Sequence, residues 1–248
     1  MWQSHRQTTN GDQPLLDQFP IARHWAPAHP DRIQLYSLPT PNGVKVSIAL
    51  EELGLPYEVH RIDFAKDEQK SEAFRSLNPN GKIPAMIDID GPNGQPIGLF
   101  ESGTILHYLA DKTGRLLPDD RARRWEAIAW LHFQVGGIGP MFCQVGYFNI
   151  FAGKEIDDPR PLDRYVSEAR RLLGVLDERL ADGPWIMGAD YSIADIATLG
   201  WIRNLITFYE ARELVDFDAF EYLPGWLDRW LARPAVQRGL NIPARPET

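Results

Sequence analysis

At 248 residues, the chain is long enough for one large domain or two of medium size. Its formal net charge of -8 disfavours nucleic acids and anionic membranes as partners, because both require a basic face. A single cysteine, Cys143, excludes an internal disulfide, a CxxC pair and a cysteine-based metal cluster. We expect no metal cofactor.

Two segments of the sequence bear on the cellular location of the protein. The first thirty residues are polar and lack the apolar run of a secretory signal. Residues 127–152 contain no Asp, Glu, Lys or Arg, but their glycines, amides and proline favour a buried, broken helix over a membrane span. We therefore expect a cytoplasmic protein.

The first half of the chain alternates strand and helix patterns. Residues 1–31 are polar and proline-bearing, with Trp2, Phe19 and Trp25, which predicts an extended arm that is ordered only if its aromatic side chains find a groove. Residues 32–113 form the next unit, in the order β-α-β, short α, β-β-α. Its strands are predicted at 33–38, 56–62, 85–88 and 97–100, and its helices at 44–53, 73–77 and 103–112.

The second half, residues 119–240, follows a charged, proline-bearing linker and is predicted to be entirely helical. Helices are expected at 121–151 (bent near Gly139-Pro140), at 162–180, from Ser192, at 223–231 and at 234–239. Ser192 and Asp195 have the spacing of a capping box, which we interpret as structural.

Two motifs stand close together between residues 78 and 109. Asn78-Pro-Asn-Gly-Lys-Ile-Pro84 is a turn that runs directly into an apolar strand, where a proline is either an ordinary edge-strand start or a special turn. Phe100-Glu101-Ser102-Gly103 leads from a strand into a helix, with Ser102 expected at the N-cap. Although most N-cap serines only cap, such a helix start binds a carboxylate well, because free N–H groups converge there.

Three segments together resemble the glutathione transferase superfamily: NPNGKIP with a cis Pro84, FESGTIL at 100–106, and GADYSIADI at 188–196. LYSLPTPNG at 35–43 and QVGGIGP at 134–140 are most similar to the bacterial Nu class, which binds two glutathiones or glutathione disulfide and acts on disulfides. The resemblance spans about 33–240. It implies an α/β thioredoxin-like domain followed by an all-α domain, and a homodimer.

The resemblance also implies roles for individual residues toward glutathione. Ser102 and the amides after it would bind the γ-glutamyl carboxylate, and Glu101 would attract the ammonium. The backbone of Ile83 would pair with the cysteinyl unit, with cis Pro84 holding that edge open. The remaining implied contacts are Lys82 and Gln69 at the glycine end and Arg164 near the carboxylates of a glutathione pair. The chain departs from the Nu pattern at Ala129, where a polar residue is usual.

The thiol of glutathione needs a donor that lowers its pKa, because the thiolate is the nucleophile. Thr40 and Asn42, at the start of a predicted helix, offer a hydroxyl and an amide. Tyr36 is the rival donor, but its place inside a strand favours packing. Cys143 lies in an apolar stretch, which predicts a buried, inert thiol. Both electrons for disulfide reduction would then come from two glutathiones.

The acceptor pocket is less defined. Phe133, Phe142, Tyr147 and Phe148 either line it or belong to the core. The leading interpretation is a glutathione-dependent transferase or disulfide reductase. The alternative is a non-catalytic glutathione-binding or regulatory module, since fold alone does not determine function. A glutathione-dependent peroxidase or dehalogenase would differ only in the acceptor pocket.

Overall fold

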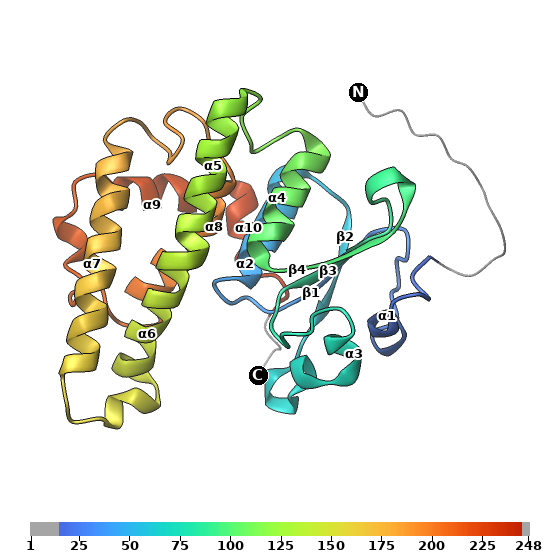
Figure 1. The fold of residues 1–248 in the computed structure, drawn as a ribbon, viewed down its shortest axis with the longest axis horizontal. Coiled ribbons are helices and arrows are strands. Elements are labelled where there is room, and N and C mark those ends of the chain that lie inside the picture. The colour runs from blue at the N-terminus through green and yellow to red at the C-terminus, as the bar shows by residue number, and fades with distance from the viewer. Residues whose placement is uncertain (1–14, 245–248) are drawn as a thin grey trace.

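The computed structural model describes residues 15–244 and places a mixed four-stranded sheet beside a bundle of helices (Figure 1). The sheet order is β2-β1-β3-β4, with β1 and β2 parallel and β3 and β4 antiparallel to their neighbours. The strands are β1 (Ile33–Ser37), β2 (Tyr57–Arg61), β3 (Ala85–Asp88) and β4 (Ile97–Phe100). The predicted thioredoxin-like order is confirmed.

Helices cover both faces of the sheet, which explains why all of β1 and β3 is buried. Alternate residues point to opposite faces, so Leu35 packs with α2 (Gly43–Leu53) and α4 (Ser102–Thr113), whereas Tyr36 packs on the other side. That other side carries α1 (Pro20–His24) and α3 (Glu72–Arg75). Three short 3₁₀ turns complete this half: Phe64–Lys66, Glu68–Lys70 and Pro92–Gly94.

The second half is helical, as predicted. Its helices are α5 (Arg121–Phe133), α6 (Gly139–Ile150), α7 (Arg160–Leu180), α8 (Ile193–Ile206), α9 (Leu223–Leu231) and α10 (Pro234–Gly239), with 3₁₀ turns at Ala152–Glu155 and Phe217–Ala219. A π-helical turn, Gln134–Ile138, joins α5 to α6 directly before Gly139-Pro140, where the sequence predicted a bend. No helix within residues 15–244 is long and apolar enough to cross a membrane.

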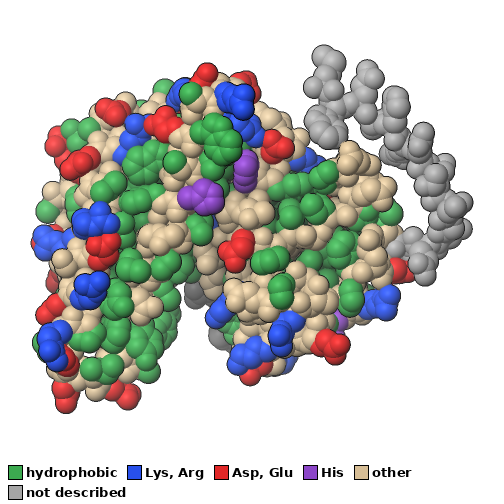
Figure 2. Space-filling model, viewed as in Figure 1, with side chains coloured by type: hydrophobic (Ala, Val, Ile, Leu, Met, Phe, Trp, Pro, Cys, Tyr) green, Lys and Arg blue, Asp and Glu red, His purple; other side chains and the backbone are tan. Residues whose placement is uncertain are grey.

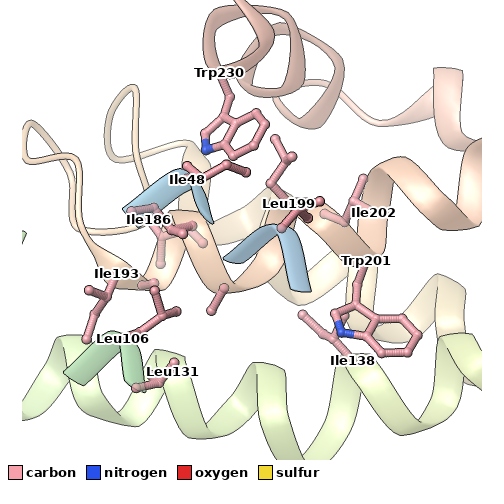
Figure 3. Close-up of a cluster of buried hydrophobic side chains, with 14 of the residues drawn as sticks. Ile48, Leu106, Leu131, Ile138, Ile186, Ile193, Leu199, Trp201, Ile202 and Trp230 are labelled. Carbon is pink, nitrogen blue, oxygen red and sulfur yellow. The ribbon is translucent and has the colours of Figure 1, made fainter. Parts of the chain in front are cut away.

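One hydrophobic core joins the two halves (Figure 3). Ile48 of α2 and Leu106 of α4 belong to the same buried cluster as Leu131 of α5 and Ile193 of α8. The predicted capping box at Ser192 is confirmed, and Asp195 is fully buried within it. Asp195 also accepts from the Ile186 amide and the Trp226 indole, each at 2.9 Å, so it fixes the start of α8.

The described part of the arm, from residue 15 onward, is not simply extended. It contains α1, and its Leu16 and Ile21 are buried in the cluster on the far face of the sheet. The Glu58 carboxylate accepts from the Ala28 amide at 2.8 Å and from the His29 amide at 2.6 Å. Apolar contacts and this carboxylate together dock the segment on the body of the protein. Trp2 lies outside the described residues.

Candidate active site at the junction of the two halves

The loop between β1 and α2 is held in a tight conformation beside the helical half. The Thr40 hydroxyl oxygen accepts from the Gly43 amide at 3.3 Å, so its proton remains available for donation. Gly43 itself has no room for a side chain, since a Cβ there would lie 1.8 Å from the Leu38 carbonyl oxygen. Asn42 is the residue before α2 and makes no side-chain cap, which leaves its amide group for other contacts.

The second loop of the site lies at the start of α4. Here the sequence prediction was off by one residue: Glu101 is the N-cap, and Ser102 is the first helical residue. Because Ile105 makes the first helical bond back to the Glu101 carbonyl, the amides of residues 102–104 precede the hydrogen-bond ladder. Glu101 has φ 68° and ψ 113°, a conformation rare for a residue with a side chain, and its side chain is exposed. Backbone strain of this kind is common at ligand sites.

Asn42 connects these two loops to α8. Its Oδ1 accepts two hydrogen bonds, a long one from the Ser102 hydroxyl at 3.5 Å and one from the Trp201 indole N–H at 3.0 Å. Since an indole nitrogen only donates, the Asn42 amide orientation is fixed, and its NH₂ group points away from Trp201. Gly200 permits this contact, because a Cβ there would lie 2.6 Å from the Pro41 carbonyl oxygen. The close approach of α8 therefore fixes the orientation of the Asn42 amide.

Sequence reasoning missed Lys45, which lies beneath both loops. It is 1% exposed, and its Nζ donates to Ser102 Oγ at 3.2 Å and to Gln134 Oε1 at 2.5 Å. Burial lowers the pKa of the Lys45 amine to about 7, while the Glu101 carboxylate acts in the opposite direction. A signal was present, since Lys45 precedes Ile48 and Ala49 by three and four residues on the buried face of α2.

The Ile83-Pro84 peptide bond is cis, as predicted, and directly precedes the first β1–β3 pair, Tyr36 with Ala85. Asn78 shapes the turn before it by donating to the Lys82 carbonyl at 2.5 Å. The Lys82 side chain is exposed. A Cβ on Gly81 would lie 3.1 Å from the Gln69 carbonyl, so the Gln69 loop lies against this turn. Gln69 has a buried Oε1 without a hydrogen-bond partner.

Other candidates lie apart from this cluster or have different surroundings from those expected. Arg164 is exposed in the first turns of α7 and makes no described contact with Asn42 or Ser102. Tyr36 is a packing residue as expected: it is fully buried, stacks on His60 at 4.7 Å, and has a pKa raised by burial. The expectation that Cys143 is buried was wrong, because the residue is exposed. The apolar residues around Cys143 fill the core on other sides of α6.

The four aromatic candidates divide between core and surface. Phe142 is fully buried and belongs to the core. Phe148 stacks on Tyr165 at 5.7 Å, whereas Tyr147 is exposed. Figure 2 shows the molecule hollowed between the helical half and the sheet half, with hydrophobic side chains over the lower part of the helical half. Among residues 15–244 there is no group of three or more His, Cys, Asp or Glu placed to hold a metal ion.

Comparison with known proteins identifies the family. Residues 40–112 match the glutathione S-transferase N-terminal domain, and residues 159–229 match the corresponding C-terminal domain. The chain belongs to the glutathione transferase family. It is 42% identical over 211 residues to the disulfide-bond oxidoreductase YfcG of Escherichia coli, covering 84% of this chain and 94% of that protein.

Two solved structures of this family are similar throughout. A glutathione transferase from Burkholderia graminis, with two glutathione molecules bound per subunit, is 62% identical with a TM-score of 0.91, covering 93% of this chain and 96% of that one. A glutathione transferase from Pseudomonas putida, with one glutathione disulfide bound per subunit, is 59% identical with a TM-score of 0.90, covering 92% and 99%. Both support the Nu-like resemblance seen in the sequence.

Proposed function

We propose that this protein is a glutathione-dependent thiol–disulfide oxidoreductase of the glutathione transferase family. The observation that carries the proposal is the convergence of two helix starts: Asn42 before α2 and Ser102 at the start of α4 lie 3.5 Å apart, side-chain oxygen to side-chain oxygen. The amides of residues 102–104 and the positive dipole ends of the two helices meet at this place, which suits a tripeptide that carries carboxylates and a nucleophilic thiolate.

The proposed binding roles follow the polarity of glutathione. Ser102 and the amides after it take the γ-glutamyl carboxylate, and the exposed Glu101 carboxylate attracts the ammonium. The Ile83 backbone, at an edge kept open by cis Pro84, pairs with the cysteinyl unit as an added strand would. Lys82 and the neighbouring Gln69 take the glycine carboxylate. The donor for that carboxylate is the Gln69 NH₂ group, which in the free protein donates to Asp67 Oδ1 at 3.4 Å.

Thr40 and Asn42 are the proposed catalytic residues. The Thr40 hydroxyl proton and the Asn42 NH₂ group are both available as donors, and either contact stabilises a thiolate over a thiol. The first glutathione thiolate attacks the substrate disulfide, forming a mixed disulfide and releasing one thiol. A second glutathione thiolate attacks that mixed disulfide, which yields glutathione disulfide and the second thiol. Two electrons pass from two glutathiones to one disulfide, and no protein thiol is consumed.

The second glutathione would lie in the hollow between the two halves (Figure 2). We assign Arg164 to its carboxylates. Its exposure on α7 leaves the guanidinium free to reach an anionic ligand, and the glutathione pair in the Burkholderia graminis relative supports space for two molecules. Ala129 is exposed and adds no polar contact.

We also propose a cytoplasmic homodimer. A single, exposed cysteine suits a reducing compartment, where glutathione is kept reduced. A groove between α4 and α5 contains Leu99 and the 63%-exposed Trp125 together with the Asp111–Arg124 ion pair. A patch with apolar surface and both signs of charge can pair with its own copy about a twofold axis. Sedimentation equilibrium should give twice the chain mass of 28.2 kDa.

Turnover of hydroxyethyl disulfide with glutathione, coupled to glutathione reductase, tests the proposed activity. A parallel assay uses a chloronitrobenzene acceptor. Strong disulfide turnover with weak conjugation is the expected result. Conjugation alone would indicate an ordinary transferase, and glutathione binding without either activity would indicate a non-catalytic module.

A further inference from the structure

Lys45, which lies beneath the site, is unusual among lysines because it is buried. Lysine is rarely buried completely unless it is paired, yet Lys45 is 1% exposed, and the partners of its amine are two neutral oxygens, Ser102 Oγ and Gln134 Oε1. A charged amine there is costly without a nearby anion. The Glu101 carboxylate favours the charged form but belongs to an exposed side chain that water screens.

The other groups around Lys45 do not supply an anion. The π-helical turn contributes the Gln134 amide, and α8 contributes Trp201 through its bond to Asn42. The acidic residues of α2, Glu51 and Glu52, are already paired with arginines of the C-terminal region, Arg238 and Arg233. Among residues 15–244, the Lys45 amine therefore has no ion-pair partner, and one of its two neutral partners is Ser102.

The proposed function puts an anion on that side, because the γ-glutamyl carboxylate would bind Ser102. Resting on that assignment, we propose that Lys45 is a positioning residue of the carboxylate subsite. Its amine donates to Ser102 Oγ, so the single hydroxyl proton of Ser102 faces away from Lys45, toward Asn42 Oδ1 at 3.5 Å in the free protein and toward the carboxylate once the ligand displaces that long contact. The Lys45 amine takes up a proton from solvent when the carboxylate arrives.

The pH dependence of ligand binding follows from the charge of the Lys45 amine in the free protein and in the complex. With a pKa of about 7 in the free protein, the Lys45 amine is mostly neutral at pH 8 and mostly charged at pH 6. A bound carboxylate favours the ammonium and therefore raises the pKa of Lys45. Ligand binding is then accompanied by proton uptake at pH 8 and by little proton uptake at pH 6. Affinity then falls as the pH rises above 7.

The test uses S-methylglutathione, which has no ionisable thiol, and isothermal titration calorimetry in buffers of different ionisation enthalpy. We expect roughly half a proton or more taken up per ligand at pH 8, and a Kd that rises roughly tenfold between pH 6 and pH 8. Lys45→Met should abolish both effects. Lys112→Met, at the far end of α4, is the matched control and should retain both.

The outcomes separate this inference from the proposed function. Binding without proton uptake in the native protein would overturn the role of Lys45 while leaving glutathione binding intact. An equal uptake in Lys45→Met would also overturn it, by assigning the proton to another group. Failure of S-methylglutathione to bind would overturn both proposals. The measurement on the native protein needs no variant to fold.

Discussion

Replacing Ser102 with alanine removes a hydroxyl from the proposed carboxylate subsite, together with its contacts to Lys45 and Asn42. Ser102 is 6% exposed and stands in the first position of α4, where its oxygen accepts from Lys45 at 3.2 Å. The Ser102 proton, whose acceptor in the free protein is Asn42 Oδ1 at 3.5 Å, can turn to a bound carboxylate. A hydrogen bond to a charged group contributes about 1.5–3 kcal/mol, so the Kd for glutathione should rise about 10- to 150-fold. The helix amides and the dipole remain and preserve weak binding.

Isothermal titration calorimetry with glutathione measures this change directly. Thr113→Ala is the matched control, because it removes a hydroxyl at the opposite end of the same helix, where Thr113 bonds only to the carbonyls of Leu109 and Ala110. The control should bind glutathione as the native protein does. A Kd for Ser102→Ala within twofold of the native value would refute the assignment of the carboxylate to Ser102.

Three further predictions address catalysis and stability. Thr40→Ala should lower kcat for disulfide turnover while leaving the Kd for glutathione largely unchanged; equal turnover would remove Thr40 from the mechanism. Trp201→Phe deletes the N–H that orients Asn42 and should raise the pKa of the bound glutathione thiol, read from thiolate absorbance against pH, whereas an unchanged pKa would show that Asn42 does not act on sulfur. Asp195→Ala leaves the buried Ile186 amide and Trp226 indole without an acceptor, so the free energy of unfolding should fall by about 3–5 kcal/mol in urea titrations; a loss below about 1 kcal/mol would contradict the capping role.

Local patterns in the sequence predicted most of the architecture. The strands at Ala85–Asp88 and Ile97–Phe100 and the capping box at Ser192 depend on short-range chemistry, and each was predicted. The cis form of Pro84 was implied by the family resemblance and not by a local pattern. Helix ends were less certain, because Glu101 adopts a positive φ that no local rule for glutamate anticipates. For that reason Ser102 was expected at the N-cap, whereas it is the first residue of α4.

Other features depended on contacts between distant segments. The exposure of Cys143 could not be read from its apolar neighbours, because α6 packs on α7 and α8 and leaves one side of the helix open. Lys45 was missed because its partners Ser102 and Gln134 lie 57 and 89 residues further along the chain. The helix in the arm forms where Ile21 and Leu16 meet the sheet, which is a tertiary effect.

The central claim is that both reducing electrons come from glutathione and none from the protein. The most direct test is hydroxyethyl disulfide turnover by Cys143→Ala, coupled to glutathione reductase, since Cys143 is the only cysteine in the sequence. The account predicts a rate like that of the native protein, with one NADPH consumed for each disulfide reduced. A large loss of turnover in a variant that still binds glutathione would contradict it and make the protein thiol a participant.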